Sequence, residues 1–291
     1  HREWTTEQQQ NLAAIVRLYR GETNRYLELI DSYIKQANEA ANKVEPSKEI
    51  LDKHIEGLLS NLRNYVAKTK EEKRTPAKTK ALKESNFFEE LNNYSRNTPK
   101  SNDVVLSNLS YPIETTPLEN DAQLEAATHL EWSVTQNKLD SDALKPDVNT
   151  LLELWKIADK NLKLKTDKIW SNNDLGKADK VLDEALQNYL DAIEEAAYWQ
   201  TNINWLQSRF PEAKYEDVVG LCKMADKTEY VDEQEYSLNA GRYVGVVIDG
   251  DNITHEEFEE RMELNVEKLK KLVNQSHNIN ESIFSNLSNL L

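Results

Sequence analysis

The chain has 291 residues, of which 38% are hydrophobic and 30% are charged, and its formal net charge is −15. Such a composition is typical of a globular, helix-rich protein, and seven Gly and seven Pro leave little room for many-stranded sheets. An acidic chain is poorly suited to grip DNA over its whole surface, and no apolar run approaches the roughly 20 residues that span a membrane.

The first 65 residues carry two amphipathic helical patterns. The first helix should begin at Thr6, because Gln9 follows three residues later as in a capping box. Gly21 interrupts its apolar stripe and predicts a bend or a close helix contact. A second helix should begin after Pro46, with Ser47 as its N-cap. The apolar positions of both helices recur at helical spacing and predict a buried face: Leu12, Ile15, Val16, Tyr19, Tyr26, Ile30, Tyr33, Ile34, Ile50, Leu51, Ile55, Leu58, Leu59, Leu62 and Tyr65.

Residues 68–83 form a basic segment with seven Lys or Arg residues and Pro76 near its centre. Its composition predicts a mobile, solvated loop between helices. The alternative is an arm that contacts phosphate groups. The residues that would make those contacts are Lys73, Arg74, Lys78 and Lys80.

Three further helices are expected downstream. A short one should cover 124–134, and another should begin at Pro146 and Asp147. A long helix should run from a cap at Asp174 to about Arg209, because Pro211 cannot continue it. Six Trp residues lie almost all on helical stripes, which predicts that they pack in the core.

The stretch YSLNAGRYVGV, residues 236–246, breaks this helical pattern. We expect a turn followed by a short β-like run, in which Gly241 and Gly245 allow backbone geometry that other residues resist. Arg242 should pair with a carbonyl or carboxylate across this junction, or with a phosphate in a larger complex. Just before it, the single cysteine, Cys222, excludes an intrachain disulfide and should be a small buried hydrophobic residue in a cytoplasmic protein.

A last helix should begin at Thr254, with Glu257 completing a capping box. Its apolar positions alternate by four and three residues, as in a heptad seam, and Asn280 lies within that seam, where it would fix the register. Such a narrow seam requires a partner helix, from this chain or another. The residues of the seam are Met262, Val266, Leu269, Val273, Ser276, Asn280, Ile283, Leu287 and Leu290.

Motifs of catalysis are absent from the sequence. It contains no Gly-rich phosphate loop, no Cys-x-x-Cys pair, no His-Glu-x-x-His and no Gly-x-Ser-x-Gly. The stretch VVIDGDN at 246–252 lacks the downstream acidic residue of a calcium loop. We therefore predict no catalytic, cofactor-binding or metal site in this chain.

Residues 210–246 closely resemble the C-terminal region of modification subunits from type I restriction-modification systems. That family carries a Phe-Pro-x-Ala-x-Tyr-x-Asp-Val-x-Gly-Leu-Cys-Lys phrase and then Ser-Leu-Asn-Pro-Gly-Arg-Tyr-Val-Gly, where this chain has Ala240 in place of Pro. Residues 4–22 and 256–272 also resemble family segments. The matching positions are Phe210, Pro211, Ala213, Tyr215, Asp217, Val218, Gly220, Leu221, Cys222, Lys223, Ser237, Leu238, Asn239, Gly241, Arg242, Tyr243, Val244 and Gly245.

The resemblance implies a parent subunit that methylates adenine N6 in DNA with S-adenosylmethionine. The chain starts at His1 and lacks the family's Asn-Pro-Pro-aromatic and cofactor motifs, so we expect the catalytic domain to precede it. The implied partners are the specificity subunit and, in the full complex, a second modification subunit, the restriction subunit and DNA, with no membrane involved. The alternatives are a free-standing helical scaffold that pairs through its coiled-coil end and, with least support, an enzyme complete in this chain.

The predicted fold is thus all-α, a multi-helix bundle with three parts. These parts are a helical body over 1–209, a junction over 210–253 and a coiled-coil-like helix over 254–291.

Overall fold

The computed structural model describes residues 3–71, 80, 86–98, 118–162, 175–237 and 239–245, together with 262, 265, 266, 268–270, 273 and 276. The regular structure of these residues is almost entirely helical, which confirms the all-α prediction. Among them, β structure is limited to one bridge between Val218 and Cys222. The elements are α1 (Thr6–Tyr19), α2 (Thr23–Glu71), α4 (Phe87–Asn93), α5 (Asn120–Leu162), the 3₁₀ turn η4 (Leu175–Lys177), α7 (Ala178–Gln207), the π-helical turn η5 (Thr228–Glu233) and α8 (Gly241–Val244).

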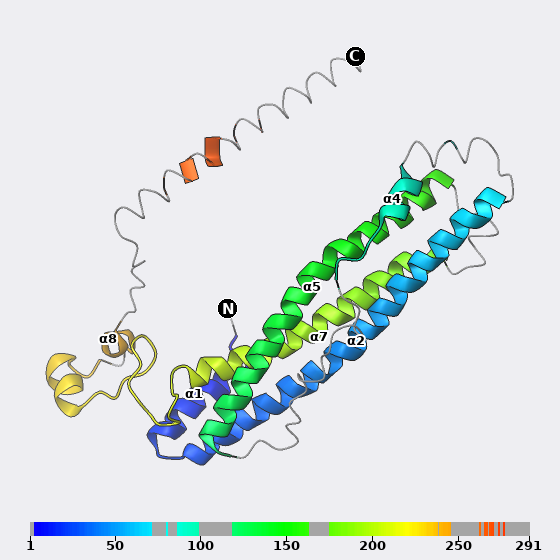
Figure 1. Cartoon of the computed structure of the whole chain (residues 1–291). Coiled ribbons are helices and arrows are strands. Elements are labelled where there is room, and N and C mark those ends of the chain that lie inside the picture. The colour runs from blue at the N-terminus through cyan, green and yellow to red at the C-terminus, as the bar shows by residue number, and fades with distance from the viewer. Residues whose placement is uncertain are drawn as a thin grey trace. The chain divides into compact units, whose positions relative to one another are not determined.

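The chain divides into two compact units, His1–Glu216 and Asp217–Leu291. In the first unit, α2, α5 and α7 run side by side, α1 packs on α2 and α7 at one end, and α4 lies on α5 at the other (Figure 1). Phe210 and Ala213, which the sequence places in the junction, are buried in this unit. The helical body therefore extends past the end of α7.

The first helix begins at Thr6, as predicted, but its capping box pairs Thr5 with Gln8 instead of Thr6 with Gln9. Thr5 is the N-cap: its Oγ1 accepts from the Gln8 amide at 3.2 Å, and Gln8 Oε1 accepts from the Thr5 amide at 3.0 Å. The helix ends at Tyr19 with Arg20 as its C-cap, and the following Gly21 adopts φ +75°. The Gly21 amide donates to the Leu18 carbonyl and the Glu22 amide to the Arg17 carbonyl, the Schellman pattern. Gly21 thus separates two helices rather than bending one.

Two predicted helix starts, at Pro46 and at Pro146, are wrong. The helix α2 continues through Pro46, and α5 continues through Pro146 from Asn120 to Leu162. A proline inside a helix costs about 3 kcal/mol, because it removes one hydrogen bond and crowds the preceding turn. Both proline residues are exposed, so water can reach the carbonyl left without a partner. Burial of the stripes on either side of each proline offsets the remaining cost.

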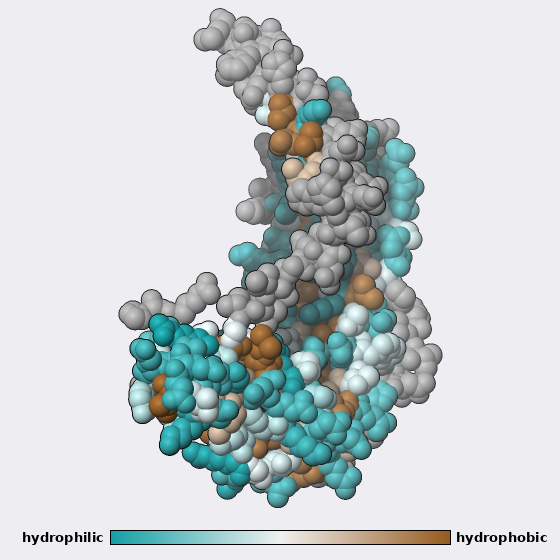
Figure 2. All heavy atoms as spheres, turned by 90° about the vertical axis from the view of Figure 1, so that its left-hand side faces the viewer, coloured by the Kyte–Doolittle hydropathy of each residue, from teal (hydrophilic) through white to brown (hydrophobic). Residues whose placement is uncertain are grey.

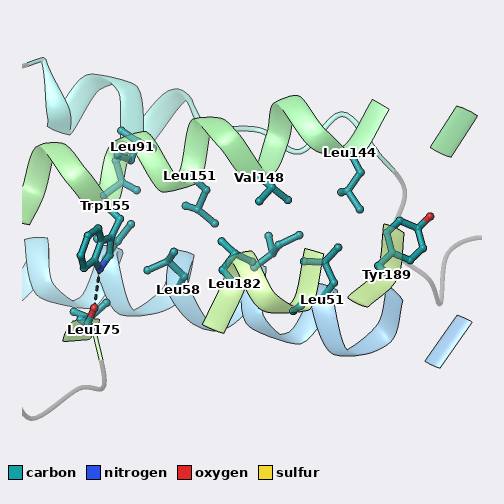
Figure 3. Close-up of a cluster of buried hydrophobic side chains, with 14 of the residues drawn as sticks. Leu51, Leu58, Leu91, Leu144, Val148, Leu151, Trp155, Leu175, Leu182 and Tyr189 are labelled. Carbon is teal, nitrogen blue, oxygen red and sulfur yellow. Dashed lines mark hydrogen bonds between the residues drawn. The ribbon is translucent and has the colours of Figure 1, made fainter. Parts of the chain in front are cut away.

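The core of the first unit lies between α2, α5 and α7. Figure 3 shows Leu51 and Leu58 of α2 pointing toward Leu151 of α5 and Leu182 of α7. The Trp155 indole Nε1 donates to the Leu175 carbonyl at 2.7 Å, which ties η4 to α5. Leu51 and Leu58 belong to the stripe that the helical spacing predicts.

The prediction for the tryptophan residues holds only in part. Among those described, Trp155 is buried, Trp199 and Trp205 are half-buried, and Trp4 and Trp132 are exposed. Helical periodicity alone did not distinguish the buried from the exposed tryptophan residues, because residues at the edge of a packed helix face share its spacing but remain partly in contact with solvent. Trp170 and the expected cap Asp174 lie outside the described residues.

The short segment after α4 that contains Asn97 and Thr98 is hydrogen-bonded to α5. Asp147 of α5 accepts four hydrogen bonds from it, from the amide and Nδ2 of Asn97 and from the amide and Oγ1 of Thr98. Nearby, Arg96 lies 2.7 Å from Asp52 of α2. The segment therefore links α5 to α2 through buried polar groups that the sequence pattern did not indicate.

Candidate partner-binding surface

Besides Ser276, four apolar residues of the predicted seam are described, and all four are helical: Met262, Val266, Leu269 and Val273. Their side chains are 49%, 44%, 61% and 58% exposed, in that order. Spacings of four, three and four residues put them on one face of a helix. By contrast, most of the apolar stripe of α2 is buried, although Ile50 is exposed. The visible surface in Figure 2 is mostly hydrophilic, with a minority of apolar side chains.

These four side chains form an apolar face that is exposed in the described part of the second unit. Full burial of one such side chain contributes roughly 1.5–3 kcal/mol, so four contribute at most about 6–12 kcal/mol. Association itself costs an estimated ~4–15 kcal/mol. The four positions alone would therefore give weak binding, and a tight complex needs more of the seam or a second surface. Asn280, Ile283 and Leu287, predicted to supply the rest, lie outside the described residues.

The junction motif folds as a compact turn. The Ser237 hydroxyl accepts from the Asn239 amide at 3.3 Å, and Asn239 Oδ1 accepts from the Gly241 amide at 3.2 Å. The Tyr243 hydroxyl then donates to the Ser237 carbonyl. These bonds start the helical turn α8, which lies almost entirely within the turn predicted for residues 238–243. The β-like run expected after that turn lies mostly outside the described residues.

Only one of the two glycines in the motif needs its conformational freedom. Gly245 has φ +72°, a left-handed geometry that strains other residues. Gly241 lies in α8, and a Cβ there would meet Asn239 Oδ1 at an ordinary 3.5 Å, so the prediction for Gly241 is wrong. Ala240, where the family has Pro, has φ −54°, which is within the range of proline. The turn therefore keeps a proline-like backbone.

The Arg242 side chain is exposed, and within the described part of the second unit no hydrogen bond or ion pair joins its guanidinium group to another residue. Its backbone amide donates to the Asn239 carbonyl at 3.0 Å. The expected pairing across the junction is therefore not seen among these residues. Tyr243 is half-buried and closes the turn instead. Leu238, the remaining candidate of the motif, lies outside the described residues.

The rest of this unit is held by short-range contacts. The Gly220 amide donates to the Val244 carbonyl at 2.7 Å, which joins the segment before η5 to α8. Lys223 Nζ donates to Glu229 Oε1 at 2.6 Å, and this bond raises the pKa of Lys223. Cys222 is half-buried rather than buried, because it lies in a thin, turn-rich region. This segment therefore has few buried side chains to stabilise it.

The basic segment is described only at its edges. Residues 68–71 belong to α2 and Lys80 is helical, so the predicted loop over 68–83 is wrong at these residues. Lys80 is helical and exposed, as a contact to phosphate would require. Lys73, Arg74 and Lys78 lie outside the described residues.

The described residues hold no group of three or more His, Cys, Asp or Glu side chains that could bind a metal ion. None of the described helices is both long enough and apolar enough to cross a lipid bilayer.

One feature that the sequence did not predict is a polar pocket between α5 and α7, which includes the buried side chain of Gln207. A polar residue on the buried stripe of α7 was the only sequence signal for it.

Comparison with known proteins gives no match among family models, curated proteins or solved structures. The likeness to type I modification subunits therefore rests on the sequence motifs alone.

Proposed function

We propose that this chain is the C-terminal assembly region of a type I restriction-modification modification subunit. Its exposed seam packs on a helix of the specificity subunit, which reads the DNA sequence. The parent subunit would methylate adenine N6 with S-adenosylmethionine through a domain that precedes this chain. In the full complex a second modification subunit, the restriction subunit and DNA complete the assembly.

The observation that carries this proposal is the uncovered helical face of Met262, Val266, Leu269 and Val273. An apolar face that stays exposed in one chain is a usual mark of an interface. The motif around Arg242 supports the family, because its Ala240 backbone fits the proline of the family pattern. The bonded turn at Ser237 would then position the last helix for its partner.

A pull-down of the specificity subunit encoded beside this chain tests the proposal. The variant carries Leu269→Asp and Val273→Asp, which place two charges in the seam. Burying an unpaired charge costs several kcal/mol, so binding should weaken by more than about a hundredfold. The control carries Asn274→Asp and Gln275→Asp, which add the same charge off the seam and should leave binding within about threefold.

If both variants bind the specificity subunit equally well, the interface does not lie on the seam. If the wild-type chain captures no specificity subunit, the proposal fails. Sedimentation of the chain alone tests the alternative function, a self-pairing scaffold. Self-association that the seam variant abolishes would favour that scaffold, because the same exposed face would then serve two copies of the chain.

If the catalytic domain lies outside this chain, the chain itself should not bind the methyl donor. Calorimetry with S-adenosylmethionine should show no saturable binding to this chain. A micromolar site would contradict the assignment of catalysis to a preceding domain.

A further inference from the structure

The second unit contains a segment that folds without a core. None of the described residues in 217–237 and 239–245 is buried. The segment is built from short turns, among them η5 and α8, and backbone hydrogen bonds join these turns (Figure 1). Burial of apolar side chains supplies most of the stability of a folded protein, whereas each hydrogen bond adds little after its competition with water. Contact with a partner would therefore stabilise this segment more than a part of the chain that has its own core.

Two exposed tyrosine residues of this segment lie against each other. The side chain of Tyr230 is 39% exposed, that of Tyr236 is 68% exposed, and the ring centroids are 6.2 Å apart. The Tyr236 amide donates to the Tyr230 carbonyl at 2.7 Å. The main chain thus holds the two rings together, although neither ring packs in a core.

The backbone that presents this pair is strained. Glu235 and Tyr236 adopt φ +48° and +59°, a left-handed geometry that residues other than glycine rarely adopt. They come shortly after η5, whose π-helical geometry is rare in proteins and often lies at functional sites. Strain of this kind is concentrated at binding and catalytic sites. Here it presents two tyrosine rings to solvent, and tyrosine is enriched in protein interfaces.

The surroundings of the pair are acidic. From Asp226 to Tyr236 the chain has five acidic residues and one basic residue, Lys227. Three of the acidic side chains flank the pair in sequence and are exposed: Asp232, Glu233 and Glu235. Interfaces are complementary in charge, and a guanidinium or ammonium group also binds the face of an aromatic ring. A partner that covers the pair should therefore present basic side chains.

The seam of the last helix needs a second surface for tight binding. Its four described apolar side chains can do little more than offset the cost of association. The tyrosine pair belongs to the same unit as the seam. It is the exposed aromatic contact of that unit, and its charge selects a basic partner.

We propose that Tyr230 and Tyr236 form a second contact surface for the specificity subunit, which covers them with a basic patch. The rings are buried in the complex, and basic side chains of the partner pair with Asp232, Glu233 and Glu235. This inference rests on the function proposed above, because it takes its partner from there.

Hydrogen exchange of the full chain, alone and with the specificity subunit encoded beside it, is the first test. Amides of residues 217–245 should exchange at least about tenfold more slowly in the complex, because their opening then requires the partner to leave. Amides of the buried face of α7 are the internal control and should change by less than about twofold. A complex that forms without slowing exchange over 217–245 would overturn the inference.

The second test removes one ring. Tyr236→Asn keeps a residue that tolerates the left-handed geometry, and it should weaken binding about tenfold in calorimetry. Tyr236→Phe keeps the ring and should bind within about threefold of the wild type. The control is Tyr19→Asn, which removes an exposed ring of the first unit and should bind within about twofold. Exchange of the Gly220 amide, which donates to the Val244 carbonyl, reports whether each variant keeps the fold of the segment.

The third test removes charge without touching the rings. Asp232→Asn with Glu233→Gln should weaken binding at least about threefold and should reduce its dependence on salt. The control, Asp121→Asn with Glu125→Gln, removes the same charge from exposed positions of α5 and should bind as the wild type does. Equal binding by these two variants would contradict a basic partner surface.

The outcomes separate this inference from the function on which it rests. If the seam variant Leu269→Asp with Val273→Asp binds weakly while Tyr236→Asn binds as the wild type does, the tyrosine surface is wrong and the proposed function stands. If only Tyr236→Asn binds weakly, the tyrosine surface stands and the seam is not the interface. Self-association of the chain alone that Tyr236→Asn abolishes would assign the surface to a second copy and overturn the inference.

Discussion

Removing the Asp147 carboxylate should destabilise the bundle strongly. Asp147 is 4% exposed and accepts hydrogen bonds of 3.0, 3.1, 3.2 and 2.9 Å from Asn97 and Thr98. Each hydrogen bond to a charged group contributes about 1.5–3 kcal/mol. The sum of the four values would overestimate the loss of stability, because the carboxylate is desolvated on folding and the donors can bond to water once it is removed. We therefore expect Asp147→Ala to lower the free energy of unfolding by about 3–5 kcal/mol.

Thermal unfolding followed by circular dichroism measures this effect, and Tm should fall by on the order of 10 °C for a unit of this size. Hydrogen exchange should also quicken at the Asn97 and Thr98 amides. The control is Asp142→Ala, because Asp142 is 70% exposed and pairs only with Lys145 at 3.0 Å, a contact worth about 0–1 kcal/mol. Equal Tm values for the two variants would show that the segment after α4 does not hold the bundle together.

Three further changes test other parts of the structure. Trp155→Phe should cost about 2–4 kcal/mol in urea unfolding, because it opens a cavity and removes the indole's hydrogen bond to the Leu175 carbonyl. Ala240→Pro should raise the stability of the second unit by about 0.4–1 kcal/mol in the same assay, since φ is already −54°; a loss would show that the turn rejects proline. Burial, reinforced by nearby carboxylates, raises the folded-state pKa of Glu45, so its contribution to stability is present at low pH and lost as pH rises through that pKa. The Tm of Glu45→Gln minus the Tm of the wild type should therefore increase as pH rises through that pKa, and a difference that does not depend on pH would contradict this.

The sequence by itself determined the helical class and most of the buried residues. Apolar residues at helical spacing marked the core faces of α2 and α7, because a helix buries one face whatever lies opposite it. The heptad spacing likewise marked Leu269 and Val273 as one face, which the structure leaves exposed. The capping box was recognisable too, although one residue away, because Thr5 and Thr6 offer the same chemistry.

Other features were decided by tertiary structure alone. Local rules end a helix at Pro46 and Pro146, but α2 and α5 continue, because burial on both sides outweighs one lost hydrogen bond on an exposed face. The four bonds to Asp147 join residues about fifty positions apart, and no local pattern encodes them. The unpaired donor of Gln207 also depends on how α5 meets α7. Periodicity specifies which face of a helix is buried, whereas the partners of polar groups depend on contacts that form only when the helices pack.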